Sequence, residues 1–161
     1  MVDHSSLIDY YTSVSCHELA VALNRNLGWQ IALVVLPDAP YWEDESDPDN
    51  TLPSVLHAYA VDPDGNAWDI EGVRPAAQMV RDAEDRFQES GASMEMMFGE
   101  DDLRTYVGYW GDEDEEAIDR PLTDYTDQDV AEAWEHAQHV FAAWPQWQAL
   151  QGKPSTPRWR P

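Results

Sequence analysis

Apolar residues return every three or four positions in three segments of the chain, and this spacing predicts three helices. The three segments are 16–27, 76–89 and 127–144. The first is preceded by the pattern S-x-x-E, in which Ser15 and Glu18 are placed to form a capping box at a helix start. We therefore expect one helix near the beginning of the chain, one near its middle and one towards its C-terminus.

Short apolar runs rich in β-branched and aromatic residues predict strands over 29–37, 54–61 and 66–72. The last two runs are separated by the turn sequence D-P-D-G, which indicates an antiparallel pair. The segment 38–53 is acidic and contains several prolines, so we expect a long loop there, whereas 92–99 fits either a strand or a loop. Helices combined with antiparallel strands indicate an α/β (α+β) fold.

Length and composition limit the kind of protein. A chain of 161 residues with 43% apolar residues can bury one core, and we expect a single globular domain over 1–145 followed by a proline-rich tail over 146–161. The single cysteine excludes an intramolecular disulfide and a multi-cysteine zinc site. No signal peptide is visible and the longest apolar run, 31–36, is too short to cross a bilayer. We expect a cytoplasmic protein that makes no membrane contact.

The charge of the chain is strongly negative. It has 32 acidic and nine basic residues, which give a formal net charge of −23. Such a field repels phosphate backbones, so we expect no direct binding of nucleic acid. Adaptation to high salt, imitation of a nucleic acid towards a basic partner, and simple solubility all explain the charge and all stay open.

The only cysteine, Cys16, falls in the first turn of the first predicted helix. Unpaired backbone N–H groups and the helix dipole favour a thiolate at such a position, which is the state that a cysteine nucleophile requires. Packing as a small apolar side chain is the alternative. The neighbouring His17 is expected at the rim of a cleft or in solvent, because adjacent helical residues point about 100° apart.

A histidine and a carboxylate are predicted to meet across the D-P-D-G turn. If 63–65 forms a three-residue loop, Asp62 pairs with Asn66, and His57 then lies diagonally from Asp69 on one side of the sheet. A two-residue loop would place Asp69 on the opposite side. Proline followed two positions later by glycine favours the longer loop. We therefore expect an imidazole–carboxylate pair in which Asp69 orients His57.

A cysteine that starts a helix, a histidine on a following strand and a polar residue about a dozen positions later resemble the papain-like cysteine hydrolases, especially the compact NlpC-type branch. The sequences S-C-H-E-L-A-V-A-L and L-H-A-Y-A-V-D-P-D-G-N-A-W-D-I-E-G carry this resemblance, which covers roughly 12–90. It implies that the cysteine helix packs on a small antiparallel sheet and that further helices follow towards the C-terminus. It also implies Cys16 as nucleophile, His57 as general base and Asp69 as the orienting residue.

We accordingly expect a cysteine hydrolase or acyl transferase, such as a thiol protease, an amidase or a deamidase, that acts on a peptide or protein without a cofactor. The papain-type glutamine upstream of the cysteine is absent, so Tyr10, Tyr11 or backbone amides would bind the oxyanion. The alternative is a non-catalytic acidic binding protein, such as an inhibitor, an immunity-type factor or a nucleic-acid mimic, with a basic protein partner. No metal is expected, because His136 and His139 lack the H-E-x-x-H pattern.

Overall fold

A computed structural model describes residues 11, 16–42, 51–108, 122–123 and 125–152 of the chain. Its helices are α2 (Cys16–Leu27), α3 (Gln78–Phe87), α5 (Asp127–Phe141) and α6 (Pro145–Gly152), with a 3-10 helix η1 (Glu100–Thr105). Its strands are β1 (Gln30–Trp42), β2 (Thr51–Val61), β3 (Asn66–Asp69), β4 (Gly72–Pro75), β5 (Ser93–Met97) and β6 (Val107–Gly108). The predicted α+β class is confirmed.

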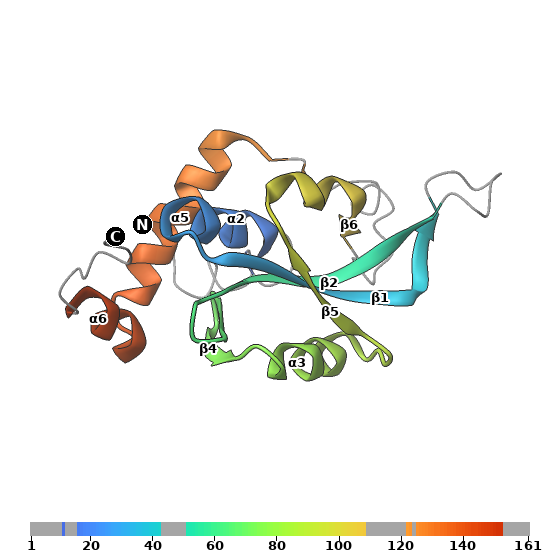
Figure 1. The fold of residues 1–161 in the computed structure, drawn as a ribbon, viewed down its shortest axis with the longest axis horizontal. Coiled ribbons are helices and arrows are strands. Elements are labelled where there is room, and N and C mark those ends of the chain that lie inside the picture. The colour runs from blue at the N-terminus through green and yellow to red at the C-terminus, as the bar shows by residue number, and fades with distance from the viewer. Residues whose placement is uncertain (1–10, 12–15, 43–50, 109–121, 124, 153–161) are drawn as a thin grey trace, which may run out of the picture.

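The strands form one sheet with helices on both faces (Figure 1). The order is β4-β3-β2-β1-β5, and every neighbouring pair along this path is antiparallel. The short strand β6 lies off this path and pairs with β2 in parallel. Helix α2 packs on one face of the sheet together with α5, and α3 packs on the other face (Figure 1).

The apolar run in β1 is buried on both faces because each face is covered by helices. Ile31, Leu33 and Val35 face the larger core, which also contains buried residues of α2 and α5. The intervening residues face a smaller core formed with Met79 and Ala83 of α3. This alternation follows from the two-residue period of a strand, and it explains a run that is apolar at consecutive positions.

The turn between β2 and β3 has the predicted length. The backbone N–H of Asp62 donates to the carbonyl of Asn66 over 2.9 Å, and Ala60 pairs with Trp68. Residues 63–65 therefore form a three-residue loop, and Gly65 has the expected left-handed backbone with a φ of +85°. This turn sets the register that places Asp69 on the side of the sheet where His57 lies.

Replacing Gly65 with alanine is expected to destabilise the fold by about 1–2 kcal/mol, which is the penalty that a Cβ atom suffers in the left-handed region. A Cβ atom at this position would meet nothing within 4 Å, so the effect is purely conformational. Gly99 is the matched control, because its φ is −174° and a Cβ atom there also meets nothing. Urea unfolding should show a loss for Gly65→Ala and almost none for Gly99→Ala, and equal losses would contradict this explanation.

The expected loop over 38–53 is wrong at both ends. Strand β1 continues to Trp42 and β2 begins at Thr51, so these two strands form a longer hairpin than predicted, and 43–50 lies outside the described residues. The ladder is interrupted between Leu36 and Tyr41. Prolines at 37, 40 and 53 fall in this interruption, where a strand tolerates residues that cannot donate a backbone hydrogen bond.

The expected tail after residue 145 is also corrected. Pro145 is the first residue of α6, a position that suits proline because its missing N–H would be unsatisfied there. Trp147 of this helix is buried, and its ring packs edge-on against Trp68 of β3 and Phe141 of α5. The helix therefore belongs to the main core, and 153–161 lies outside the described residues.

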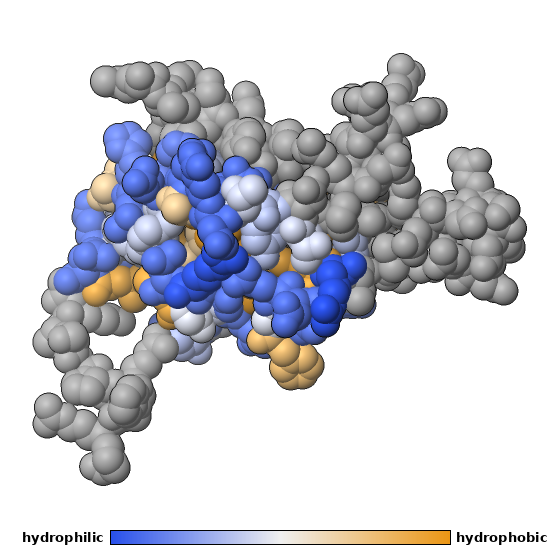
Figure 2. Space-filling view, turned by 90° about the horizontal axis from the view of Figure 1, so that it is seen from above, coloured by the Kyte–Doolittle hydropathy of each residue, from blue (hydrophilic) through white to orange (hydrophobic). Residues whose placement is uncertain are grey.

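The helices predicted over 76–89 and 127–144 are confirmed with shorter bounds, whereas the strand predicted over 66–72 ends at Asp69 and is followed by a turn. Helix α2 has the predicted bounds, although Ser15 lies outside the described residues. Segment 92–99 contains strand β5. No described helix is long and apolar enough to cross a membrane, and hydrophilic side chains dominate the described part of the face shown in Figure 2.

Candidate active site

Cys16 is the first residue of α2 and is partly buried. The helix is held on the sheet by the buried side chains of Leu19 and Leu23, which fixes the position of its N-terminal end. Backbone N–H groups in the first turn of a helix have no partner within the helix, and they favour a nearby negative charge. The thiol therefore lies where the backbone stabilises its anionic form.

His57 lies at a gap along one side of β2. On that side β3 pairs with β2 only at Ala60 and Val61, and β6 pairs only at Ser54 and Val55. Within the described chain, the stretch of β2 between these pairs has no strand beside it. A side chain in this gap is not enclosed by a continuous sheet. This explains how a residue of a central strand lies close to α3 and also interacts with the first residue of α2.

The predicted contact between His57 and Asp69 is confirmed. The imidazole Nε2 and the carboxylate Oδ2 are 2.9 Å apart, and the two residues are 5% and 1% exposed. The short turn after β2 produces this contact, because it brings the end of β3 back beside Tyr59 and His57. With Nε2 bound to the carboxylate, Nδ1 is the only ring nitrogen left for another partner.

Asp69 accepts hydrogen bonds from several groups in addition to His57. Arg74 of β4 donates to both carboxylate oxygens over 3.2 and 2.9 Å, and the backbone N–H groups of Glu71 and Gly72 donate to Oδ1. Burial alone would raise the pKa of Asp69, but the bonds and charges of His57 and Arg74 hold this pKa below its usual range. Asp69 is therefore a permanent anion at neutral pH.

Arg74 was not anticipated from the sequence. The segment 66–72 is not a single strand, because the chain turns at 70–71 and β4 returns from Gly72. This tight turn places Arg74 beside Asp69. The Nε of Arg74 also donates to Asp82 of α3 over 2.8 Å. The glycine at 72 after D-I-E was the only local signal for the turn.

The thiol of Cys16 and the ring of His57 influence each other strongly. Burial alone would raise the pKa of Cys16, but hydrogen-bonding and charge interactions with His17 and with His57 lower it from 9.0 to about 5. Burial would lower the pKa of His57, but Asp69 and the thiolate raise it from 6.5 to about 10. The stable form of the pair at neutral pH is thus thiolate and imidazolium.

The geometry of this pair leaves Nδ1 of His57 available. This atom is buried and has no well-aligned hydrogen-bond partner within the described residues. Its proton is shared instead with the thiol of Cys16, in the interaction that raises the pKa of His57. An imidazole with one nitrogen fixed by a carboxylate and the other beside a thiolate can move a proton to and from a reacting group.

His17 is half-buried, which fits the expected position at the rim of a cleft and not the alternative position in solvent. Its imidazole interacts with the thiol of Cys16 and helps to lower the pKa of that thiol. Its ring also lies 6.0 Å from the ring of Tyr125, measured between centroids. Adjacent helical residues point about 100° apart, yet these two side chains both belong to the first turn of the helix and interact there.

Tyr59 forms one wall beside the histidine. Its ring stacks on the ring of His57 with centroids 6.0 Å apart, and its hydroxyl is buried without a hydrogen-bond partner in the described chain. Burial and the charge of Asp69 both raise the pKa of this hydroxyl, so it stays neutral. The candidate oxyanion donor Tyr11 is bound elsewhere, because its hydroxyl lies 2.8 Å from Nδ1 of His136 on α5; Tyr10 lies outside the described residues.

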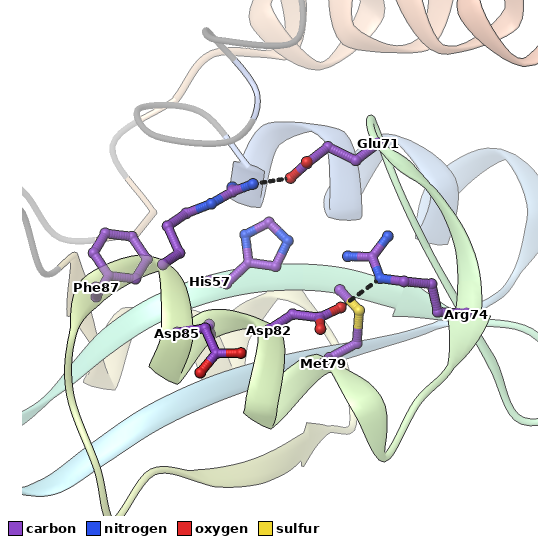
Figure 3. Close-up of a pocket in the computed structure, with 9 residues that line it drawn as sticks. His57, Glu71, Arg74, Met79, Asp82, Asp85 and Phe87 are labelled. Atoms are coloured by element: carbon purple, nitrogen blue, oxygen red, sulfur yellow. Dashed lines mark hydrogen bonds and ion pairs between the residues drawn. The ribbon is translucent and has the colours of Figure 1, made fainter.

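A cavity of about 550 Å³ adjoins His57 between α3 and the β3–β4 hairpin (Figure 3). It is open to solvent on one side and combines an apolar floor with charged walls. The lining residues are His57, Glu71, Arg74, Met79, Asp82, Ala83, Asp85, Arg86 and Phe87. A ligand in this cavity would touch the histidine of the candidate site.

The thiolate–imidazolium pair is expected to stabilise the fold over a limited pH range. The contribution of Cys16, whose pKa is lowered, is complete above pH 9.0 and is lost as the pH falls through about 5. The contribution of His57, whose pKa is raised, is complete below pH 6.5 and is lost as the pH rises through about 10. Their sum is therefore flat between pH 6.5 and 9.0.

Urea unfolding of the wild type and of Cys16→Ser at several pH values measures this contribution. The stability difference between the two proteins should be largest on the plateau and should shrink as the pH falls towards 5. A difference that stays constant from pH 9.0 down through about 5 would mean that the thiol does not ionise in the folded chain as described.

No group of three or more histidine, cysteine and acidic side chains within the described residues is arranged to hold a metal ion. In comparisons with known proteins, no family model, no curated protein and no solved structure matches the chain.

Proposed function

We propose that this protein is a cysteine hydrolase or acyl transferase of papain-like type, acting as a peptidase, an amidase or a deamidase. One observation carries the proposal: a helix-terminal thiol and a strand histidine shift each other's pKa towards the ion pair, while the other nitrogen of that histidine is bound to a buried carboxylate. The order of Cys16, His57 and Asp69 along the chain, with a helix first and strands afterwards, supports the papain-like arrangement.

In the proposed reaction the thiolate of Cys16 attacks the carbonyl carbon of an acyl substrate and forms a carbon–sulfur bond. The electron pair of the C=O bond moves to oxygen, and backbone N–H groups at the start of α2 are the candidate donors to this oxyanion. Collapse of this intermediate breaks the bond to the leaving amine, which takes the proton from Nδ1 of His57. The product is a thioester on Cys16 and a neutral imidazole.

The second half of the reaction restores the enzyme. Nδ1 of His57 removes a proton from water or from another acceptor, whose oxygen or nitrogen then attacks the thioester carbon. The carbon–sulfur bond breaks, and the electron pair returns to sulfur, so the thiolate and the imidazolium form again. Asp69 stabilises the imidazolium throughout, and Arg74 keeps Asp69 ionised and fixes its direction.

Reaction with p-nitrophenyl acetate tests the proposal without a known substrate. We expect release of nitrophenolate, an acetyl thioester on Cys16 detectable by mass spectrometry, and continued turnover as the thioester is resolved. An added amine acceptor separates acyl transfer from hydrolysis, because a transferase yields the acetylated amine. Equal turnover by Cys16→Ala, or no thioester on this residue, would reject the proposal.

A second function, binding of a basic protein, is favoured by a different observation. Phe98 follows the edge strand β5 and is 99% exposed, and the acidic residues Asp101 and Asp102 lie close to it in sequence on a chain of net charge −23. An exposed aromatic residue among carboxylates suits a partner with an apolar pocket rimmed by cations. If the protein binds such a partner, its affinity for members of a panel of basic proteins should fall as the salt concentration rises. The affinity should also fall in Phe98→Ala and should not change in Cys16→Ala.

A further inference from the structure

The cavity beside His57 has charged walls whose cations are already neutralised. Arg74 pairs with Asp69 and Asp82, and Arg86 pairs with Glu71 across the cavity, from the end of α3 to the β3–β4 turn (Figure 3). An anionic ligand would have to displace one of these carboxylates. The two guanidinium groups are thus poorly placed to recognise a negative charge.

One acidic side chain of the cavity has no such partner. Asp85 of α3 lines the cavity, and within the described chain its carboxylate forms no ion pair and no hydrogen bond. Its backbone carbonyl accepts a hydrogen bond from the side chain of Gln88. Asp85 therefore presents a negative charge to the cavity that no cation of the described chain neutralises. The net negative charge of the whole protein also attracts cations.

A second observation places this cavity beside the reacting pair. His57 forms part of its wall, and the ring of this histidine shares a hydrogen bond and charge with the thiol of Cys16. A molecule bound in the cavity therefore lies next to the group that exchanges a proton with the thiol. The apolar floor, which includes Met79 and Phe87, suits the aliphatic stem of a long side chain.

We propose that the cavity binds a positively charged side chain of the acyl substrate, with Asp85 as its counter-ion and the apolar floor beneath its methylene groups. This inference rests on the proposed function and names its substrate class: peptides or proteins that carry lysine or arginine close to the bond that Cys16 attacks. Asp85 is a specificity-determining residue in this scheme and takes no part in the bond changes.

Three chloromethyl ketones, derived from lysine, norleucine and glutamate, test this inference. They have comparable lengths, differ in charge, and react by the same step, in which the thiolate of Cys16 displaces chloride and forms a thioether. We expect the lysine reagent to inactivate the thiol up to about five-fold faster than the norleucine reagent, the upper end of the range for an exposed ion pair, and the glutamate reagent to be slowest.

Variants separate the cavity from the general field of the protein. Asp85→Asn should remove most of the preference for the lysine reagent, and Asp85→Lys should make the glutamate reagent the faster of the two charged ones. Asp64→Asn, at the exposed β2–β3 turn, removes the same charge outside the lining of the cavity and should leave the preference unchanged. Equal losses in Asp64→Asn and Asp85→Asn, or a wild type that prefers glutamate or shows no preference, would overturn the inference.

The same experiment distinguishes failure of the inference from failure of the proposed function. If the norleucine reagent modifies Cys16 of the folded protein rapidly but charge has no effect, only the cation subsite is wrong. If no reagent modifies Cys16 until the chain is unfolded, the thiol is not a nucleophile, and both the proposed function and this subsite are rejected.

Discussion

Replacing His57 with alanine is expected to slow the acylation of Cys16 by p-nitrophenyl acetate by about 10²–10⁴-fold at neutral pH, the range that a positioned acid–base group contributes. The substitution removes the imidazolium that stabilises the thiolate and the nitrogen that moves the proton. Part of the loss will be offset, because a thiolate of higher pKa is a better nucleophile. Single-turnover kinetics with mass detection of the thioester measure the effect directly.

Two further variants show whether the loss comes from the proton-transfer role. His57→Gln keeps a side-chain N–H that can donate to Asp69 but cannot act as a base, so we expect it to be as slow as His57→Ala. His139→Ala changes an exposed histidine on α5 and should react like the wild type. Near-normal acylation in His57→Gln, with normal thermal unfolding, would show that His57 only supports the fold.

Replacing Asp69 with alanine is expected to destabilise the fold by about 3–5 kcal/mol, the usual effect of removing one partner from a buried ion pair. Asp69 is 1% exposed and connects His57, Arg74 and two backbone N–H groups. Its loss leaves a half-buried guanidinium and a buried imidazolium without their shared anion. Urea unfolding near neutral pH measures the change.

Asp69→Asn separates the charge from the hydrogen bonds. The amide oxygen can still accept from His57, so orientation should survive in part, whereas the charge that raises the pKa of His57 and pairs with Arg74 is lost. We expect a stability loss smaller than that of alanine and a clear fall in the pKa of His57. Equal stabilities of the wild type and Asp69→Ala would mean that the network contributes nothing to folding.

Local chemical signals were sufficient for the elements that position the candidate site. The start of α2 at Cys16 follows from apolar spacing, and the contact between His57 and Asp69 follows from the loop length that D-P-D-G favours. Both predictions depend on residues close together in sequence. For that reason the relation between His57 and Asp69 could be derived before any tertiary structure was known.

Features that depend on distant residues were not predictable in this way. Arg74 reaches Asp69 only because the chain turns at 70–71, and its second partner Asp82 belongs to another element. The gap in the sheet that exposes His57 to α2 depends on where β3 ends and where β6 pairs with β2. The burial of Trp147 requires α5 to pack on the sheet first, so composition alone suggested a tail.

The pH dependence of Cys16 alkylation by iodoacetamide, compared between the wild type and His57→Ala, tests the central claim most directly. The claim is that His17 and His57, the latter fixed by Asp69, together hold the thiol of Cys16 as a thiolate at neutral pH. It predicts a wild-type rate that rises with a midpoint at about 5, and a midpoint displaced towards 9.0 in His57→Ala. A wild-type midpoint near 9.0 that is indifferent to His57 would contradict it and leave Cys16 as a structural residue.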